Sequence, residues 1–93
     1  RSGNHLMSTS ELLKIEQKCL SGVSIIEFFD WVISTHPALF KEYCVGKNAN
    51  IQEHAARPDF FDVLRNDPVA LIASTQLFLL EMRRTLNEQQ ANN

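Results

Sequence analysis

Residues 68–80 read PVALIASTQLFLL, and this stretch contains no charged residue. The helix that it predicts has apolar or small side chains on nearly every face, whereas a surface helix needs only one apolar stripe. Such a helix has to be covered by other polypeptide, either at the centre of its own domain or against another chain. The stretch therefore predicts a long hydrophobic C-terminal helix that forms the core of the fold.

The apolar side chains of this helix fall into three ridges: Leu71, Phe78 and Met82; Ile72, Leu79 and Leu86; and Ala73, Leu77 and Leu80. Two ridges can face other helices of the chain. The third ridge would remain exposed to solvent unless the helix lies at the centre of a bundle or at the interface between two protomers. A two-fold pair would cover the surplus ridge with its own copy, so the pattern favours self-association. The alternative is complete burial of all three ridges inside a monomer.

The remainder of the chain is divided by start and stop signals into short helical segments. Ser8 with Glu11, and Ser24 with Glu27, have the spacing of a capping box. Helix ends are predicted at Ser21-Gly22 and Gly46, and helix starts at Pro37, Pro58 and Asp67-Pro68. Residues 47–50 are predicted to form a polar loop, and its last residue, Asn50, is the expected cap of the next helix. The predicted helices cover about residues 9–20, 24–35, 37–45, 51–56, 59–65 and 68–87.

No segment alternates with the period of two that a half-buried strand requires. The predicted fold is all-α, a compact bundle of five to six helices, several of them short. Residues 1–6, RSGNHL, carry no pattern that continues into the chain. They are interpreted as the remnant of an expression tag, with Met7 as the expected natural start. Residues 7–88 form a single helical domain in this interpretation, and residues 89–93 form a frayed polar tail.

Composition narrows the class of protein. A length of 93 residues predicts one domain. Folding of a chain of this size buries only about 60–65% of the surface that the unfolded chain exposes, so a partner subunit would increase its stability. The net charge of −2 disfavours a protein whose main partner is a phosphate backbone. Two isolated cysteines, Cys19 and Cys44, suit the reducing cytoplasm. The uncharged stretch of 13 residues is shorter than the ~20 needed to span a bilayer, so no membrane contact is predicted.

The sequence offers little for catalysis, metal binding or a cofactor. The candidate metal ligands Cys19, Cys44, His36 and His54 lack the close pairing of a zinc site. A Cys44–His36 nucleophilic pair is disfavoured because a helix C-terminus raises the pKa of a thiol. No catalytic residue, metal or cofactor is predicted, and the protein is not expected to be an enzyme.

Two carboxylate pairs, Glu27 with Asp30 and Asp59 with Asp62, flank aromatic residues. Paired carboxylates can bind a cation or transfer protons, but on amphipathic helices they more often form the solvated edge of an aromatic stripe. The surrounding segments also resemble each other: Phe28-Phe29-Asp30 precedes Pro37-Ala38-Leu39, and Phe60-Phe61-Asp62 precedes Pro68 and Leu71. This similarity has two possible explanations: a duplicated helical hairpin, or a chance resemblance between helices that begin with proline.

Two classes of function are considered. The first is a small non-enzymatic accessory protein that contacts another protein as an adaptor, a chaperone-like subunit or an inhibitor, and that can form a homodimer. Its interface candidates are Trp31, Leu71, Phe78, Leu79, Met82 and Leu86, which combine large apolar area with helical spacing. The alternative is a helical DNA-binding regulator, with Lys41, Lys47, Arg83 and Arg84 as candidate contacts. These basic residues alternate with acidic residues along the sequence, which disfavours a cationic binding face. Arg83 and Arg84 also lie near a helix C-terminus, where the helix dipole favours positive charge without any nucleic-acid partner.

Overall fold

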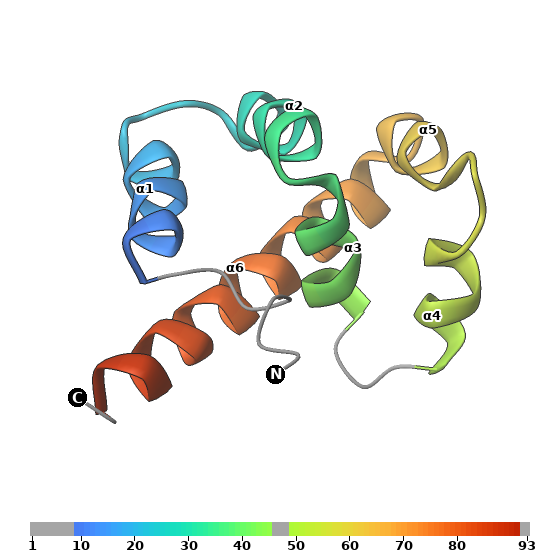
Figure 1. Ribbon diagram of the computed structural model, residues 1–93. Helices are drawn as coiled ribbons and strands as arrows, with labels where there is room; N and C mark the ends of the chain where they lie inside the picture. Colours follow the sequence, from blue (N-terminus) through green and yellow to red (C-terminus); the bar gives the residue numbers. More distant parts are fainter. Residues whose placement is uncertain (1–8, 46–48, 92–93) are drawn as a thin grey trace.

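The computed structural model describes residues 9–45 and 49–91, and within these ranges the protein is all-α. Figure 1 shows the six helices of this part of the chain, which are α1 (Thr9–Leu20), α2 (Ile25–Thr35), α3 (Pro37–Val45), α4 (Ala49–Ala55), α5 (Phe60–Arg65) and α6 (Pro68–Ala91). The predicted compact bundle with a long C-terminal helix is confirmed. None of these helices combines the length and the apolar character needed to cross a membrane.

Several helix signals read from the sequence have the expected geometry. The Ser24 Oγ accepts a hydrogen bond from the Glu27 backbone N–H at 3.1 Å, and the Glu27 carboxylate accepts one from the Ser24 backbone N–H at 3.4 Å. This reciprocal pair is the predicted capping box of α2. Gly22 ends α1 with a φ of 95°, a left-handed conformation that glycine adopts without a steric penalty. At the start of α6, the Asp67 carboxylate accepts from the Ala70 N–H at 3.2 Å.

Several helix boundaries differ from the prediction. Helix α4 begins at Ala49, so the backbone of Asn50 lies inside the helix and not before it. Helix α5 begins at Phe60, one residue later than predicted, and the Asp59 side chain makes no capping hydrogen bond. Helix α6 continues through Ala91, beyond the predicted end at Asn87. Its last turn consists of good helix formers, and Gln89 accepts a hydrogen bond from the Thr9 hydroxyl of α1 at 2.7 Å.

Some predictions fall outside the described residues. They are the tag remnant at residues 1–6, the start at Met7, the Ser8 half of the first capping box, the Gly46 stop, the loop residues Lys47 and Asn48, and the tail residues 92–93.

The core lies where α3 crosses α6, which is the most extensive helix–helix contact in the molecule. Phe78 of α6 is fully buried there, with its ring centroid 5.3 Å from that of Phe40 and 5.9 Å from that of Tyr43. Phe28 of α2 approaches Phe78 from another side at 6.1 Å. Phe29 adds an edge-to-face contact with Phe40 at 5.4 Å. This aromatic cluster fixes the positions of α2, α3 and α6 relative to one another.

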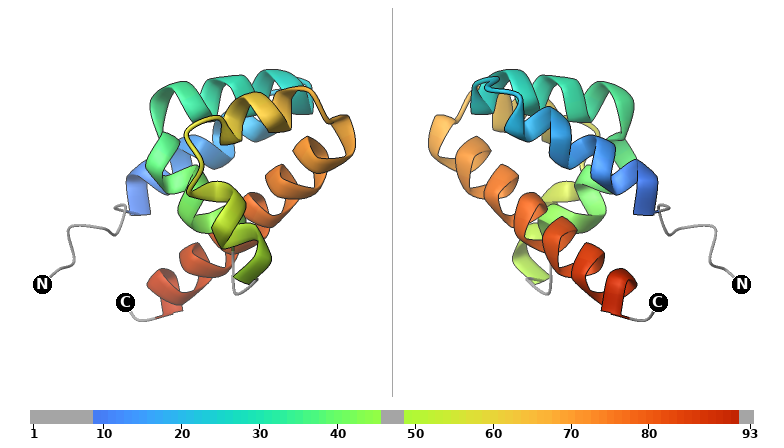
Figure 2. Two further views of the ribbon diagram at one scale, coloured as in Figure 1. Left: turned by 90° about the vertical axis from the view of Figure 1, so that its right-hand side faces the viewer. Right: turned by 90° about the vertical axis from the view of Figure 1, so that its left-hand side faces the viewer.

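Helix α6 is not enclosed on all sides. In Figures 1 and 2 the other helices lie along one flank of α6, and several of them are too short to wrap around a 24-residue helix. The alternative of complete burial of all three ridges inside a monomer is therefore wrong. Val69 is 78% exposed, Leu80 62% and Ile72 40%. Helix α6 is the core on one side and an apolar surface on the other.

Candidate functional site

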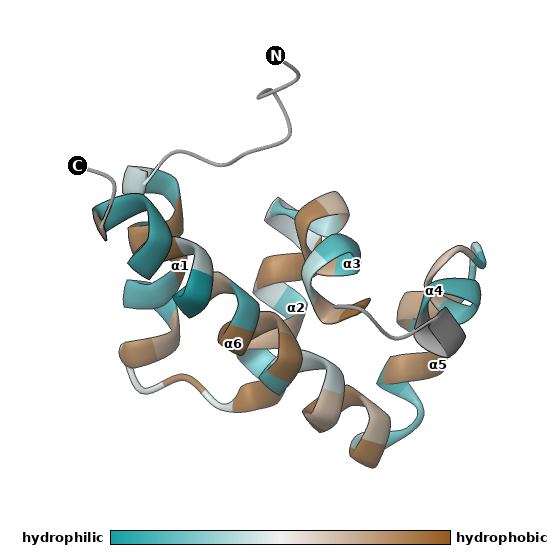
Figure 3. Ribbon diagram, turned by 90° about the horizontal axis from the view of Figure 1, so that it is seen from below, coloured by the Kyte–Doolittle hydropathy of each residue, from teal (hydrophilic) through white to brown (hydrophobic). Residues whose placement is uncertain are grey.

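The exposed side of α6 carries three large apolar side chains in line, Val69, Ile72 and Leu80, which we call the α6 strip. At 100° per residue these positions fall within about 80° of arc, so they share one face over about 16 Å of helix. Figure 3 shows α6 from this side, hydrophobic in its first half and more hydrophilic toward its C-terminal end. Isolated exposed apolar residues are ordinary on protein surfaces, but an aligned set is the feature that marks contact sites.

The predicted interface residues of α6 lie mostly on the opposite side of the helix. Leu71, Phe78, Met82 and Leu86 are all buried, at 3%, 0%, 2% and 1% exposure. Leu79 is partly buried against the same core. In the folded protomer these side chains hold the bundle together, so the surface of α6 that is open to a partner is the α6 strip.

Trp31, the remaining interface candidate, is also partly buried. Its ring stacks on Phe28 at a centroid distance of 6.2 Å and meets the His36 ring edge-on at 5.9 Å. The Lys18 Nζ lies 5.8 Å from its centroid, within the range of a cation–π contact. The ring therefore has neighbours within its own chain on several sides, and less of it is open to a partner than its size suggests.

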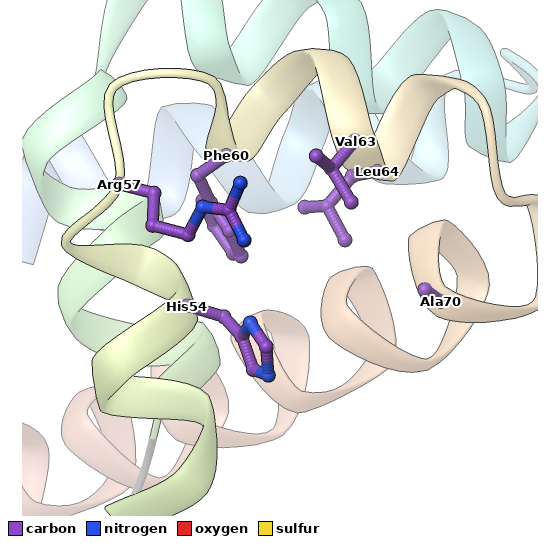
Figure 4. Close-up of a pocket in the computed structure, with 6 residues that line it drawn as sticks. All are labelled: His54, Arg57, Phe60, Val63, Leu64 and Ala70. Atoms are coloured by element: carbon purple, nitrogen blue, oxygen red, sulfur yellow. The ribbon is translucent and has the colours of Figure 1, made fainter.

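A second surface feature is a pocket of about 230 Å³ between α4, α5 and the first turn of α6. Figure 4 shows the side chains that line it, which are His54, Arg57, Phe60, Val63, Leu64 and Ala70. Four of the six are apolar, and the two polar ones, His54 and Arg57, both have side chains able to carry positive charge. His54 projects from α4 toward α6, and Arg57 lies beside Phe60 at the same end of the pocket.

Two carboxylates lie near this pocket, and both already have partners. The Asp59 carboxylate is 3.3 Å from the Arg57 Nε, in an ion pair whose two side chains are 49% and 59% exposed. Such solvent-exposed pairs contribute little and exchange easily with other ions. The Asp67 carboxylate caps α6 through the Ala70 N–H, near the end of the pocket that is distant from Arg57. The pocket is therefore polarised, with the Arg57 guanidinium and the His54 imidazole at the α4 end.

The basic residues considered for nucleic-acid contact are dispersed, and each one that the structure describes has a neighbour in its own chain. The Lys41 Nζ of α3 lies 5.3 Å from the centroid of the Phe61 ring. Arg83 pairs with Glu16 of α1, and Arg84 pairs with Glu81 at 2.9 Å, one turn earlier on α6. Lys47 lies outside the described residues. These side chains do not form the single cationic face that characterises a groove-binding helix.

Neither cysteine has the environment of a nucleophile. Cys44 is fully buried, and burial raises the pKa of its thiol to about 12, against the smaller opposing effects of a backbone hydrogen bond and of Lys41. Burial, followed by the charge of Glu16, also raises the pKa of Cys19. Raised pKa values keep both thiols protonated and unreactive at neutral pH. Burial dominates at Cys44, whereas the sequence interpretation had assigned the shift to the end of its helix.

The carboxylate pairs also have structural roles. Glu27 belongs to the capping box of α2, and Asp30 accepts a hydrogen bond from Arg65 of α5 at 2.8 Å. Asp62 lies 3.7 Å from the same Arg65 side chain. Over the described ranges 9–45 and 49–91, no three His, Cys, Asp or Glu side chains gather in a way that could hold a metal ion. What remains as a candidate site is surface: the α6 strip and the pocket.

Similarity to known proteins adds no further assignment. The sequence matches no protein-family model, and the searches of curated proteins and of solved structures find no match.

Sequence reasoning identified the apolar excess of α6 but missed both surface features. Val69 was not among the residues singled out, and Ile72 and Leu80 were assigned to two different ridges. The signal present was the apolar excess itself, because Leu80 is as large as the buried Leu71 and Leu86, so side-chain size does not separate the two sides of the helix. The pocket had no comparable signal. Its lining comes from three segments whose spatial proximity no local pattern encodes.

Proposed function

We propose that this protein is a non-enzymatic protein–protein interaction module, an adaptor, chaperone-like subunit or inhibitor, that works by contact through the α6 strip. The observation that supports the proposal is the alignment of Val69, Ile72 and Leu80 on the open side of a helix whose other side is the core. Burying a side chain of this size contributes roughly 1.5–3 kcal/mol, so covering three of them is a substantial driving force for association. The two free cysteines suit a cytoplasmic setting.

We further propose that the α6 strip pairs with a second copy of itself when no other partner is present. A two-fold axis places the same surface on both sides of the contact, so one apolar strip is enough to build it. Stable dimers bury about 800 Å² per partner, considerably more than three side chains provide. The homodimer is therefore expected to be weak, with a dissociation constant in the range of about 0.1–1 mM.

Sedimentation velocity at two protein concentrations, about 20 µM and about 1 mM, tests this proposal because the first lies below that range and the second at its upper limit. We expect a shift from monomer to dimer with rising concentration in the wild type, and a monomer at both concentrations in Leu80→Asp. Leu20→Asp is the matched control, because Leu20 is a 74% exposed leucine on α1, outside the α6 strip. It should dimerise as the wild type does.

Leu80→Asp is informative because Leu80 is 62% exposed, so the change leaves the core intact. Surface substitutions of this kind change stability by less than about 0.5 kcal/mol, which denaturation by urea verifies. A wild type that stays monomeric at the higher concentration contradicts the self-pairing proposal. A Leu80→Asp variant that still dimerises contradicts the assignment of the contact to the α6 strip.

A further inference from the structure

The pocket between α4, α5 and α6 is separate from the α6 strip, and its size indicates what it can hold. Its volume is about 230 Å³. A cavity of about 150 Å³ lined by apolar side chains binds benzene, whereas sites for drug-sized molecules start at about 300 Å³. The pocket therefore has room for one ring or one large aliphatic side chain, and it is too small for a cofactor. One apolar side chain carried by a longer ligand fits this volume.

The polarity of the pocket indicates what should stand beside that side chain. Phe60, Val63, Leu64 and Ala70 provide the apolar lining, and Arg57 lies at one end. Among the described residues, the Arg57 guanidinium is held by its exposed contact with Asp59, which another carboxylate can replace without leaving a buried charge. Arg65, at the end of α5, pairs with Asp62 and with Asp30 of α2, so this neighbouring cation is engaged toward α2. Charge complementarity thus favours an acidic group at the Arg57 end.

We propose that this pocket receives one large apolar side chain from a segment of a partner protein, and that an acidic residue adjacent to that side chain pairs with Arg57. This assignment rests on the proposed function in one respect, because it takes the segment to belong to a protein partner. The apolar side chain supplies the affinity by leaving water. The acidic residue sets the orientation, displacing Asp59 from Arg57 while Asp67 remains bound to the N-terminus of α6. The pocket is then the specificity-determining part of the contact, beside the less selective α6 strip.

Short peptides test this assignment by NMR titration of the isotopically labelled protein. The probe is N-acetyl-Phe-Glu-amide, and its matched controls replace Glu with Gln or Lys, or Phe with Ala. Burial of one side chain together with one exposed ion pair predicts dissociation constants of about 1–30 mM. We expect saturable shifts of the Val63, Leu64 and Ala70 amide signals with the Phe-Glu peptide. The Phe-Gln peptide should bind about two- to fivefold more weakly, the Phe-Lys peptide more weakly still, and the Ala-Glu peptide not measurably.

Variants of the protein separate the apolar contribution from the charge contribution. Ala70→Phe fills the pocket and should abolish binding of every peptide, whereas Ala73→Phe, an exposed position outside the pocket lining, should leave binding intact. Arg57→Gln should weaken the Phe-Glu peptide about two- to fivefold and leave the Phe-Gln peptide unchanged. Asp59→Asn should strengthen the Phe-Glu peptide about twofold, because Arg57 loses its competing partner. A purely structural role of Arg57 does not predict that gain.

Three results would overturn the assignment. The first is the absence of concentration-dependent shifts at Val63, Leu64 and Ala70 up to about 60 mM peptide, twice the largest expected dissociation constant. The second is equal binding of the Phe-Glu and Phe-Lys peptides. The third is tighter binding of a free aromatic acid such as 3-phenylpropionate, which would identify the pocket as a site for small carboxylic acids. Because these titrations read only the pocket, their failure leaves the sedimentation test of the α6 strip unaffected, and the converse also holds.

Discussion

The two sides of α6 are both apolar, yet one is the core of the molecule and the other faces solvent. The buried side presents Leu71, Phe78, Met82 and Leu86, and the exposed side presents Val69, Ile72 and Leu80. The buried set contains the aromatic ring and the longer, more flexible side chains, which fill the space between α2, α3 and α6. The exposed set contains two β-branched residues and no aromatic ring. Apolar content alone therefore does not decide burial, because the packing geometry of the neighbouring helices selects which face is used.

The largest expected difference between the two sides is in stability. Phe78→Ala removes the ring at the centre of the aromatic cluster and should lower the free energy of unfolding by about 3–5 kcal/mol, because the cavity cannot collapse completely. Leu80→Ala, on the exposed side, should change it by less than about 0.5 kcal/mol. Denaturation by urea measures both. Comparable losses in the two variants would show that the exposed side is also packed.

Chemical reactivity gives a second measure of burial. Cys44 faces the core beside α6, and burial raises its pKa to about 12, whereas Cys19 is partly exposed with a smaller rise. At about pH 8.5, iodoacetamide should therefore alkylate Cys19 at least about tenfold faster than Cys44 in the native state. Mass spectrometry of the peptides gives the two rates. Equal rates would indicate that the core opens readily.

The same thiol predicts how stability changes with pH. The folded state favours the neutral thiol of Cys44, and its pKa is raised from 9.0 to about 12. Between these two values the unfolded chain has lost the proton and the folded chain retains it, so the contribution of Cys44 to stability is complete below pH 9.0 and is lost as the pH rises toward about 12. Cys44→Ala should reduce this alkaline loss in a series of denaturation curves. An unchanged alkaline slope would contradict the burial of the thiol.

The smallest effect concerns a polar atom on the buried side of α6. Thr75 is fully buried, and its hydroxyl has no hydrogen-bond partner among the residues that the structure describes. Thr75→Val removes the unsatisfied hydroxyl while keeping a β-branched side chain, so we expect the free energy of unfolding to rise by about 1 kcal/mol. Thr85→Val, on the same helix at a partly exposed position, should be nearly neutral. A loss of stability in Thr75→Val, measured in the same urea series, would show that the hydroxyl has a partner in solution.

The sequence was sufficient to predict the helices, because their signals are local. The Ser24–Glu27 box, the Gly22 stop and the Asp67–Pro68 start depend on residues no more than a few positions apart. The end of α6 was missed because its last turn is supported by Gln89 and Thr9, which are 80 positions apart.

The orientation of α6 could not be predicted for the same reason. Its apolar residues define no single stripe, and the contacts that select the Phe78 side come from α2 and α3. The pocket depends on how α4 and α5 come to lie beside α6, which again is set by tertiary contacts. The apolar surplus was evident in the sequence, but its division into a core side and an open side required the arrangement of the helices.

The central claim is that the α6 strip is open in the protomer and becomes covered by protein. Methyl NMR spectra recorded over a dilution series test it most directly, because each methyl signal reports on its own surroundings. We expect the signals of Val69, Ile72 and Leu80 to shift with concentration while those of the buried Leu71 and Leu86 stay constant. Concentration-independent strip signals, or shifts confined to other exposed apolar residues such as Leu20 and Ile26, would contradict the account.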